Sequence, residues 1–145
     1  YGDEIVSLAT FGKCRFSSDQ GMELIRFVSK KNTQVIGGFS KILNYFQETY
    51  SSSIISYVDL RYFEGSGYLA AGFQVSGISK PNYFYFKQNE LTLHSREMFQ
   101  KHKLSNILKK YNPSLSEHEN MLENGYLRIY DAGNLKMIKD YGTSP

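Results

Sequence analysis

The chain has 145 residues, 41% of them hydrophobic and 21% charged, and its formal net charge is +3. This composition is ordinary for a globular protein and excludes wholesale disorder, and the length suits one domain with a single core. No apolar run approaches the roughly 20 residues of a membrane span, and no signal peptide is visible. The single cysteine, Cys14, excludes an internal disulfide. We therefore expect one domain over residues 1–145, in the cytoplasm and without a membrane partner.

The first half of the chain predicts a βαβ unit. Alternating apolar residues predict a strand over residues 5–11, and a polar loop follows over residues 12–21. Residues 22–28 predict a second strand, with a short helix as the alternative. Apolar residues at helical spacing predict a helix over residues 40–50, and a β-branched run predicts a buried strand over residues 54–58. A helix between two such strands favours a parallel pair.

The second half predicts short helices and strands in alternation. They are expected, in chain order, over residues 64–71 (helix), 73–78 (strand), 83–87 (strand), 94–111 (basic helix), 116–125 (helix) and 126–138 (closing β-hairpin). Ser116 and Glu119 form a capping-box pattern, and the hairpin would turn at Asp131–Asn134. The whole pattern predicts an α/β fold with a mixed, twisted sheet flanked by helices.

A pair of glycines precedes the helix at residues 40–50 and is the first candidate site. Small residues allow a tight turn, and the free N–H groups at a helix start point toward an anion. The expected ligand-binding residues are Gln34, Gly37, Gly38, Phe39 and Ser40. The spacing fits neither a P-loop nor a dinucleotide-binding GxGxxG motif. A plain tight turn is the alternative.

A polar cluster at the end of the strand over residues 54–58 is the second candidate. Tyr57, Asp59 and Arg61 lie where ligands bind in open α/β sheets, at the carboxyl end of a strand. They could position a substrate or accept a proton, or Asp59 and Arg61 could form a surface pair worth well under about 1 kcal/mol. Metal binding is not expected, because the three histidines lie far apart in sequence.

Positive charge is concentrated over residues 80–111, which carry seven basic residues against Glu90 and Glu97. Such a segment suits an anionic polymer, and phosphate contacts would make binding sensitive to salt. A solvated helical face is the alternative. The cations expected to contact nucleic acid are Arg61, Arg96, Lys101, Lys103, Lys109 and Lys110.

The order of elements resembles the acyl-CoA N-acyltransferase (GNAT) fold. Its pyrophosphate-binding turn, Gln/Arg-x-x-Gly-x-Gly/Ala, is similar to Gln34-x-x-Gly37-x-Phe39, although Phe39 stands where that motif has a small residue. Tyr68-x-x-x-Gly72-Phe73 looks like the later Tyr-x-x-x-Gly-Phe element of the fold. The resemblance implies acyl-CoA as a ligand and Tyr57, Asp59 or Tyr68 as acid–base groups.

Two narrower resemblances point to phage proteins that act on DNA. Ser56-Tyr-Val-Asp59, followed by Gly65-x-Gly67-Tyr68-x-Ala70, is similar to Mom-type DNA-modification proteins, a divergent branch of the same fold. A broader resemblance is to the C-terminal region of Hef-like homing endonucleases. The stretches that carry it include residues 10–16, 23–27, 37–41, 54–61, 79–85, 99–104 and 124–134.

The Hef-like resemblance implies a DNA-associated domain without the nuclease, which would lie upstream in a longer protein. The chain begins without an initiator Met, and residues 1–4 predict a turn with no strand before it, so we expect a fragment that lacks the N-terminal elements of the full fold. The leading expectation is DNA binding through phosphates. The alternatives are a Mom-like, acyl-CoA-dependent transferase that modifies a DNA base or another amine, and a structural remnant whose cleft Phe39 closes.

Overall fold

The computed structural model describes residues 2–16 and 21–141 and groups the chain into two compact units. Unit 1 contains residues 1–79 and 134–145, and unit 2 contains residues 80–133. We expected a single domain, whereas the chain leaves unit 1 after Ser79 and re-enters it at Asn134. Of the expected turn at residues 1–4 and loop at residues 12–21, Tyr1 and residues 17–20 lie outside the described part.

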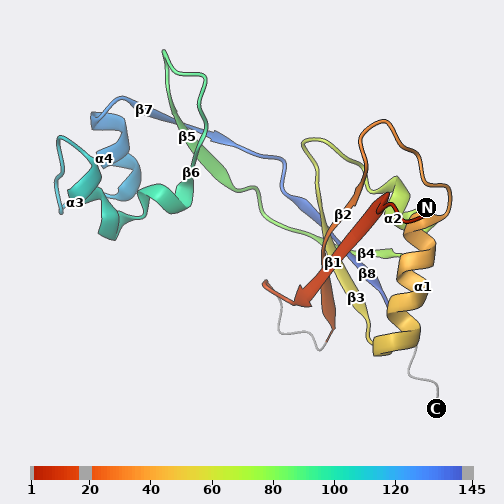
Figure 1. Ribbon diagram of the computed structural model, residues 1–145. Helices are drawn as coiled ribbons and strands as arrows, with labels where there is room; N and C mark the ends of the chain where they lie inside the picture. The colour runs from red at the N-terminus through yellow and green to blue at the C-terminus, as the bar shows by residue number, and fades with distance from the viewer. Residues whose placement is uncertain (1, 17–20, 142–145) are drawn as a thin grey trace. The chain divides into compact units, whose positions relative to one another are not determined.

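Unit 1 is built on a five-stranded mixed sheet with the order β1-β2-β3-β8-β4 (Figure 1). Its elements are β1 (Ser7–Lys13), β2 (Met22–Ser29), α1 (Gly38–Tyr50), β3 (Ile54–Asp59), α2 (Ser66–Ala70), β4 (Gln74–Ile78) and β8 (Asn134–Lys139). Strands β2 and β3 are parallel and are joined through α1, which confirms the predicted βαβ unit. Strand β8 runs antiparallel to both β3 and β4.

The core of unit 1 lies between the sheet and α1. Leu43 and Phe46 on α1 are almost fully buried, as the apolar spacing predicted. They pack with residues from three strands and the segment after α2, namely Leu24, Ile54, Val58, Phe73 and Met137. The Phe11 and Phe46 rings stack with centroids 4.2 Å apart, which ties β1 to the same helix. Burial of these side chains fixes α1 against one face of the sheet.

Unit 2 is a small antiparallel sheet with the strand order β6-β5-β7, covered by short helices (Figure 1). Its elements are β5 (Tyr83–Lys87), β6 (His94–Ser95), η1 (Arg96–Phe99), η2 (Lys101–Lys103), α3 (Leu104–Ile107), α4 (Glu117–Glu123) and β7 (Tyr126–Tyr130). Tyr85, Phe99, Leu104 and Met121 form its buried core. The predicted capping box at Ser116 and Glu119 is present at the start of α4. The fold is thus mixed α/β, as expected.

The predicted basic helix over residues 94–111 is wrong. This segment contains strand β6, two 3₁₀ turns and the four-residue α3, with extended backbone at Ser95 and Gln100. The Asn124 side chain bonds the N–H and C=O of Lys110, which ties this part of the backbone to α4. The spacing of residues within the segment could not reveal these hydrogen bonds, because their partner Asn124 lies later in the chain.

The predicted closing hairpin over residues 126–138 is also wrong, because its two strands belong to different sheets. Strand β7 pairs with β5, whereas β8 pairs with β3 and β4. Asp131 extends the β5–β7 pairing: its N–H donates to the Asn82 carbonyl, and its carboxylate accepts the N–H groups of Asn82 and Gly133. Residues 131–133 therefore link two units and do not turn one strand back on the other.

Candidate functional site

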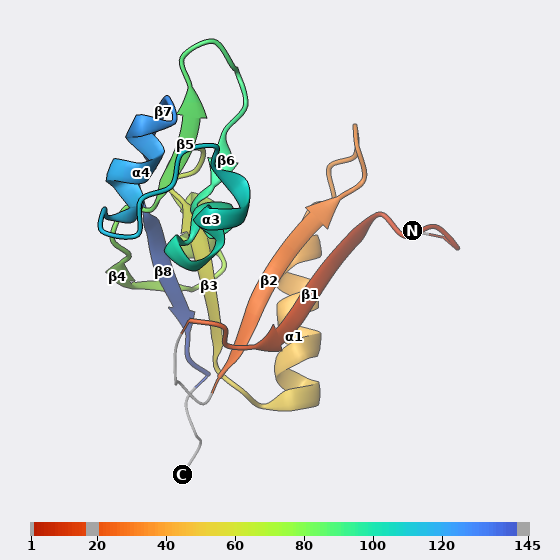
Figure 2. The ribbon, with the colours of Figure 1, turned by 90° about the vertical axis from the view of Figure 1, so that its left-hand side faces the viewer.

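Strands β2 and β3 are parallel but separate after a short stretch of pairing. They pair only through Met22 with Ile54 and Glu23 with Ile55. Beyond these pairs Figure 2 shows the two strands diverging, so that a wedge opens toward the carboxyl end of β3. In β2 a bulge coincides with the start of the divergence, since Ile25 has no partner in the β1–β2 register. A bulge bends its strand and disrupts the ladder locally, which favours this separation.

A buried serine replaces the missing ladder bond at this point. The Ser56 hydroxyl donates to the Leu24 carbonyl over 3.0 Å, and Ser56 is only 2% exposed. The Ser56 and Tyr68 hydroxyl oxygens are 3.2 Å apart. Because the single Ser56 proton goes to the Leu24 carbonyl, the Tyr68 hydroxyl donates to Ser56. The chain thus holds the Tyr68 hydroxyl at the point where the strands diverge.

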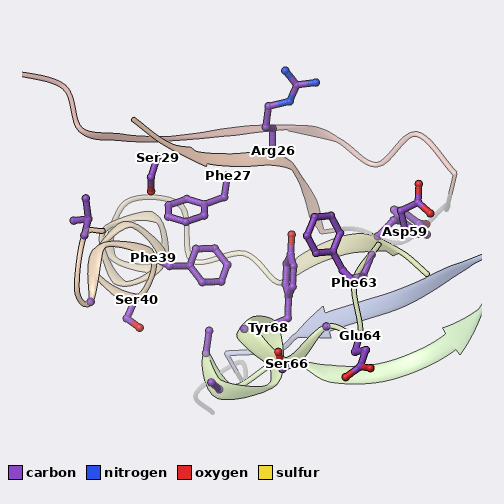
Figure 3. A pocket seen from close by; sticks show the side chains of 18 of the residues that line it. Arg26, Phe27, Ser29, Phe39, Ser40, Asp59, Phe63, Glu64, Ser66 and Tyr68 are labelled. Atoms are coloured by element: carbon purple, nitrogen blue, oxygen red, sulfur yellow. The ribbon is translucent and has the colours of Figure 1, made fainter. Parts of the chain in front are cut away.

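The wedge encloses a groove of about 1110 Å³. Its walls come from β2, the turn before α1, the end of β3, and residues 63–71. Figure 3 shows the Phe27, Phe39 and Tyr68 rings meeting at the centre of the groove, with Phe63 beside Tyr68. Arg26 also lines the groove, but its guanidinium points away from these rings. The middle of the groove is therefore aromatic.

The predicted glycine turn opens onto this groove. Gly37 caps α1 in the left-handed conformation with φ 70°, and a Cβ added there would meet nothing within 4 Å. The Gly38 N–H donates to the Val35 carbonyl, and among the described residues the N–H groups of Phe39 and Ser40 have no hydrogen-bond acceptor. Gln34, Gly37, Phe39 and Ser40 line the groove. The turn therefore presents two free amides at the start of a thirteen-residue helix.

Phe39 stands where the coenzyme-binding motif has a small residue, and its ring lies among the central rings of the groove. The Phe39 ring centroid lies 4.7 Å from that of Phe27, 5.6 Å from that of Tyr68 and 6.3 Å from that of Phe73. Figure 3 shows the ring directed from α1 toward Tyr68. These contacts hold the Phe39 ring within the groove, while a Cβ at Gly37 would meet open space.

The three predicted acid–base residues all line the groove, but they face different surroundings. Side chains alternate along a strand, and Ser56 faces Tyr68, so Tyr57 faces the opposite side of the sheet. There its ring packs edge-on against Phe16, with centroids 5.6 Å apart. Tyr68, in contrast, has its side chain among the central rings of the groove.

Asp59 is held by a fork of hydrogen bonds from Arg61. The Arg61 Nε lies 3.0 Å from Oδ1 and 3.1 Å from Oδ2, its Nη2 lies 2.6 Å from Oδ2, and its backbone N–H also donates to Oδ1. These bonds lower the pKa of Asp59, despite the opposing effect of desolvation. A carboxylate stabilised in this way is a weak base. The surface-pair alternative thus describes the contact of Asp59 and Arg61 well.

Two residues that shape the groove, Ser56 and Phe27, were not among the expected site residues. Ser56 is a polar residue within the apolar run over residues 54–58, and this exception signals a buried hydrogen bond. Phe27 lies in the alternating pattern of β2, but no local signal indicates that β2 would separate from its neighbour. The partner of Phe27 is α1, which only the tertiary fold brings near.

The predicted basic residues lie in both units. Arg61 is in unit 1, and the other five are exposed in unit 2. Among the described residues, none of these five forms an ion pair with a carboxylate; they are Arg96, Lys101, Lys103, Lys109 and Lys110. Within residues 2–16 and 21–141 no group of three or more His, Cys, Asp or Glu side chains could hold a metal ion.

No family model, curated protein or solved structure matches this chain. Across the described residues, no helix has the length and apolar character needed to cross a membrane. The groove and the exposed cations therefore carry the functional argument on their own.

Proposed function

We propose that the groove of unit 1 binds an acyl-coenzyme thioester and transfers its acyl group to an amine. The observation that carries the proposal is the convergence of three features: the diverging parallel strands, the open glycine turn and the Tyr68 hydroxyl line one groove. The separation of two central strands makes room for a ligand, and the glycine turn at a helix start is the feature that the N-acyltransferase resemblance implies for pyrophosphate binding.

The residues present fit such a substrate. The free amides of Phe39 and Ser40 and the positive end of the α1 dipole would stabilise a pyrophosphate. The open space at Gly37 admits a close approach of the ligand to the backbone. The groove volume of about 1110 Å³ exceeds that of an ordinary small-ligand pocket and suits an extended molecule.

In the reaction the amine nitrogen bonds to the acyl carbon, the carbon–sulfur bond breaks, and the sulfur leaves as a thiol. The amine loses one proton and the thiol gains one, so no other reactant is needed. Tyr68 is the residue that we assign to proton transfer, because its hydroxyl lies in the groove and is oriented by Ser56. Asp59 is engaged by Arg61, and Tyr57 faces Phe16.

A matched pair of charge substitutions on α1 tests this proposal. Ser40→Glu places a carboxylate beside the free amides, whereas Asn44→Glu adds the same charge one turn further along the helix, at an exposed position outside the groove. We expect calorimetry to show that Ser40→Glu weakens coenzyme A binding by about tenfold or more. Asn44→Glu should bind as the unmodified protein does. Undetectable coenzyme A binding by the unmodified protein would refute the proposal.

DNA binding through unit 2 is the second candidate function. It is favoured by five exposed cations between residues 96 and 110 that, within the described part of the chain, form no ion pair with a carboxylate. Cations of this kind contact DNA phosphates, and the affinity that they give falls steeply as the salt concentration rises. In a gel-shift titration with duplex DNA, we expect a shift at low salt that disappears at high salt. If neither duplex nor single-stranded DNA shifts at low salt, this function is excluded.

The full DNA-related hypothesis, in which this chain is the non-nuclease part of a phage homing endonuclease, rests on the resemblance of motifs. The two candidate functions are compatible, since the groove lies in unit 1 and the cations in unit 2. A transferase whose amine is on a DNA base would use both. Coenzyme binding without DNA binding would restrict the function to the groove.

A further inference from the structure

Two arginines of unit 2 meet one tyrosine ring. The Arg96 Cζ lies 5.2 Å from the centroid of the Tyr83 ring, and the Arg128 Cζ lies 4.8 Å from the same centroid. Arg128 also lies 5.1 Å from the centroid of Tyr130, and the Tyr83 and Tyr130 rings pack edge to face with centroids 5.8 Å apart. We call these four residues the arginine–tyrosine cluster. Three of them, Tyr83, Arg128 and Tyr130, were not among the expected site residues.

The two arginines carry charge that no carboxylate compensates directly. Among the described residues, neither Arg96 nor Arg128 forms an ion pair. Glu117 accepts the hydroxyl groups of Tyr83 and Tyr85 over 2.8 Å and 3.0 Å. Asp131 accepts backbone N–H groups. These two carboxylates are therefore engaged by other donors.

Both guanidinium groups lie so close to one ring that their mutual repulsion is not fully screened. Their separation cannot exceed the sum of the two distances to the Tyr83 centroid, which is no more than the Debye length of about 10 Å at 0.1 M salt. Each guanidinium also carries five N–H donors in a planar fork. An anion placed between or beside them would relieve the repulsion and accept these donors.

The cluster also offers an accessible aromatic surface. Tyr130 is 55% exposed, and it stands opposite Tyr83 in the β5–β7 register, so the two rings share one face of the sheet. The Arg128 guanidinium lies over both rings. An exposed ring beside ordered cations can stack on a base while the cations contact the phosphates.

We propose that the arginine–tyrosine cluster binds single-stranded nucleic acid, with a base stacked on Tyr130 and phosphates held by Arg96 and Arg128. Unpaired bases present free faces for stacking, which the bases inside a duplex do not, so the aromatic part of the cluster favours a single strand. This inference deepens the second candidate function and rests on it: it names the surface and the form of nucleic acid.

The test measures fluorescence anisotropy with a labelled oligo-dT of about 12 nucleotides, a length within the usual site size of single-strand binders. The unmodified chain should bind this strand more tightly than a duplex of equal length. Tyr130→Leu keeps an apolar side chain but removes the ring, and it should weaken single-strand binding by about tenfold. Tyr130→Phe keeps the ring and should retain binding. Tyr45→Leu, which removes an exposed tyrosine of unit 1, is the matched control and should have no effect.

The two arginines are tested through the salt dependence of the same measurement. Arg96→Gln and Arg128→Gln should each reduce the slope of log affinity against log salt by about 0.7, the value for one phosphate contact with a single strand. Arg128→Lys, which retains the charge, should keep this slope while losing the forked contact. Thermal unfolding of each variant shows whether unit 2 remains folded.

The outcomes separate this inference from the function on which it rests. If the chain binds neither single-stranded nor duplex DNA, the second candidate function and the cluster proposal are both overturned. Duplex binding that needs Lys101 and Lys103 but is unchanged by Tyr130→Leu overturns only the cluster. Single-strand binding that inorganic phosphate abolishes at millimolar concentration, with no loss in Tyr130→Leu, would show a simple anion site and overturn the stacking proposal.

Discussion

Replacing Ser56 by alanine tests the hydrogen bond that accompanies the divergence of β2 and β3. The substitution removes the donor to the Leu24 carbonyl, and it removes the acceptor of the Tyr68 hydroxyl. Ser56 is 2% exposed and Leu24 is 2% exposed, so water cannot readily replace the lost donor. Loss of a partner from a buried polar group costs about 1–3 kcal/mol. We therefore expect Ser56→Ala to lower the free energy of unfolding by about 2 kcal/mol.

Urea denaturation monitored by circular dichroism measures this change. With a slope of about 1–3 kcal/mol per molar urea, a loss of about 2 kcal/mol shifts the midpoint by about 1 M. Ser76→Ala, which truncates an exposed serine on β4 of the same unit, is the matched control. It should change the free energy of unfolding by less than about 0.5 kcal/mol.

A double-mutant cycle with Tyr68→Phe separates the two contacts of Ser56. If the Tyr68 hydroxyl donates to Ser56, the combined variant should lose less stability than the two single variants together, by about 0.5–1.5 kcal/mol. Additive effects would refute the contact between the two hydroxyls. A Ser56→Ala variant as stable as the unmodified protein would refute the larger claim that this serine completes the pairing of β2 with β3.

Three other results follow from buried contacts in the two units. Hydrogen bonds from Arg15 lower the pKa of Glu23, so this pair contributes stability above the unfolded pKa of about 4.3 that is lost as pH falls. As pH falls, the difference in free energy of unfolding between the Glu23→Gln variant and the unmodified protein should therefore shrink. Desolvation, followed by the hydrogen bond to Glu117, raises the pKa of the Tyr85 hydroxyl. The stability that the protonated hydroxyl contributes should therefore be lost as pH rises above about 10. Tyr85→Phe, which removes this hydroxyl, should reduce the loss of stability at alkaline pH. Leu104→Ala in the core of unit 2 should lower the free energy of unfolding of this unit by about 2–5 kcal/mol. Hydrogen exchange of the β5 amides measures this change. A loss below about 1 kcal/mol would contradict the assigned core.

Local patterns in the sequence determined most of the helices and strands. Apolar spacing predicted α1 and its buried residues Leu43 and Phe46, since a helix must bury one face. The capping box at Ser116 predicted the start of α4, because both of its hydrogen bonds join residues three positions apart. Such features involve neighbours in the chain and can be read without knowing the tertiary fold.

The tertiary structure decided the pairing of strands and the environment of the candidate site. Residues 126–138 read as a hairpin, but β8 pairs with β3 and β4 because burial of Met137 in the core of unit 1 favours that sheet. The basic segment read as a helix, but the side chain of Asn124, at the C-terminal end of α4, bonds the backbone of Lys110. Both errors have one physical cause: contacts with distant residues outweighed local preference.

The candidate site shows the same division. The sequence by itself located the glycine turn, the cations and Tyr68, because each belongs to a short motif or a local run of charge. It could not show that Tyr57 faces away from Tyr68, that Arg128 stands beside Tyr83, or that β2 separates from β3. These facts depend on strand register and packing between segments far apart in the chain, and only the folded structure fixes them.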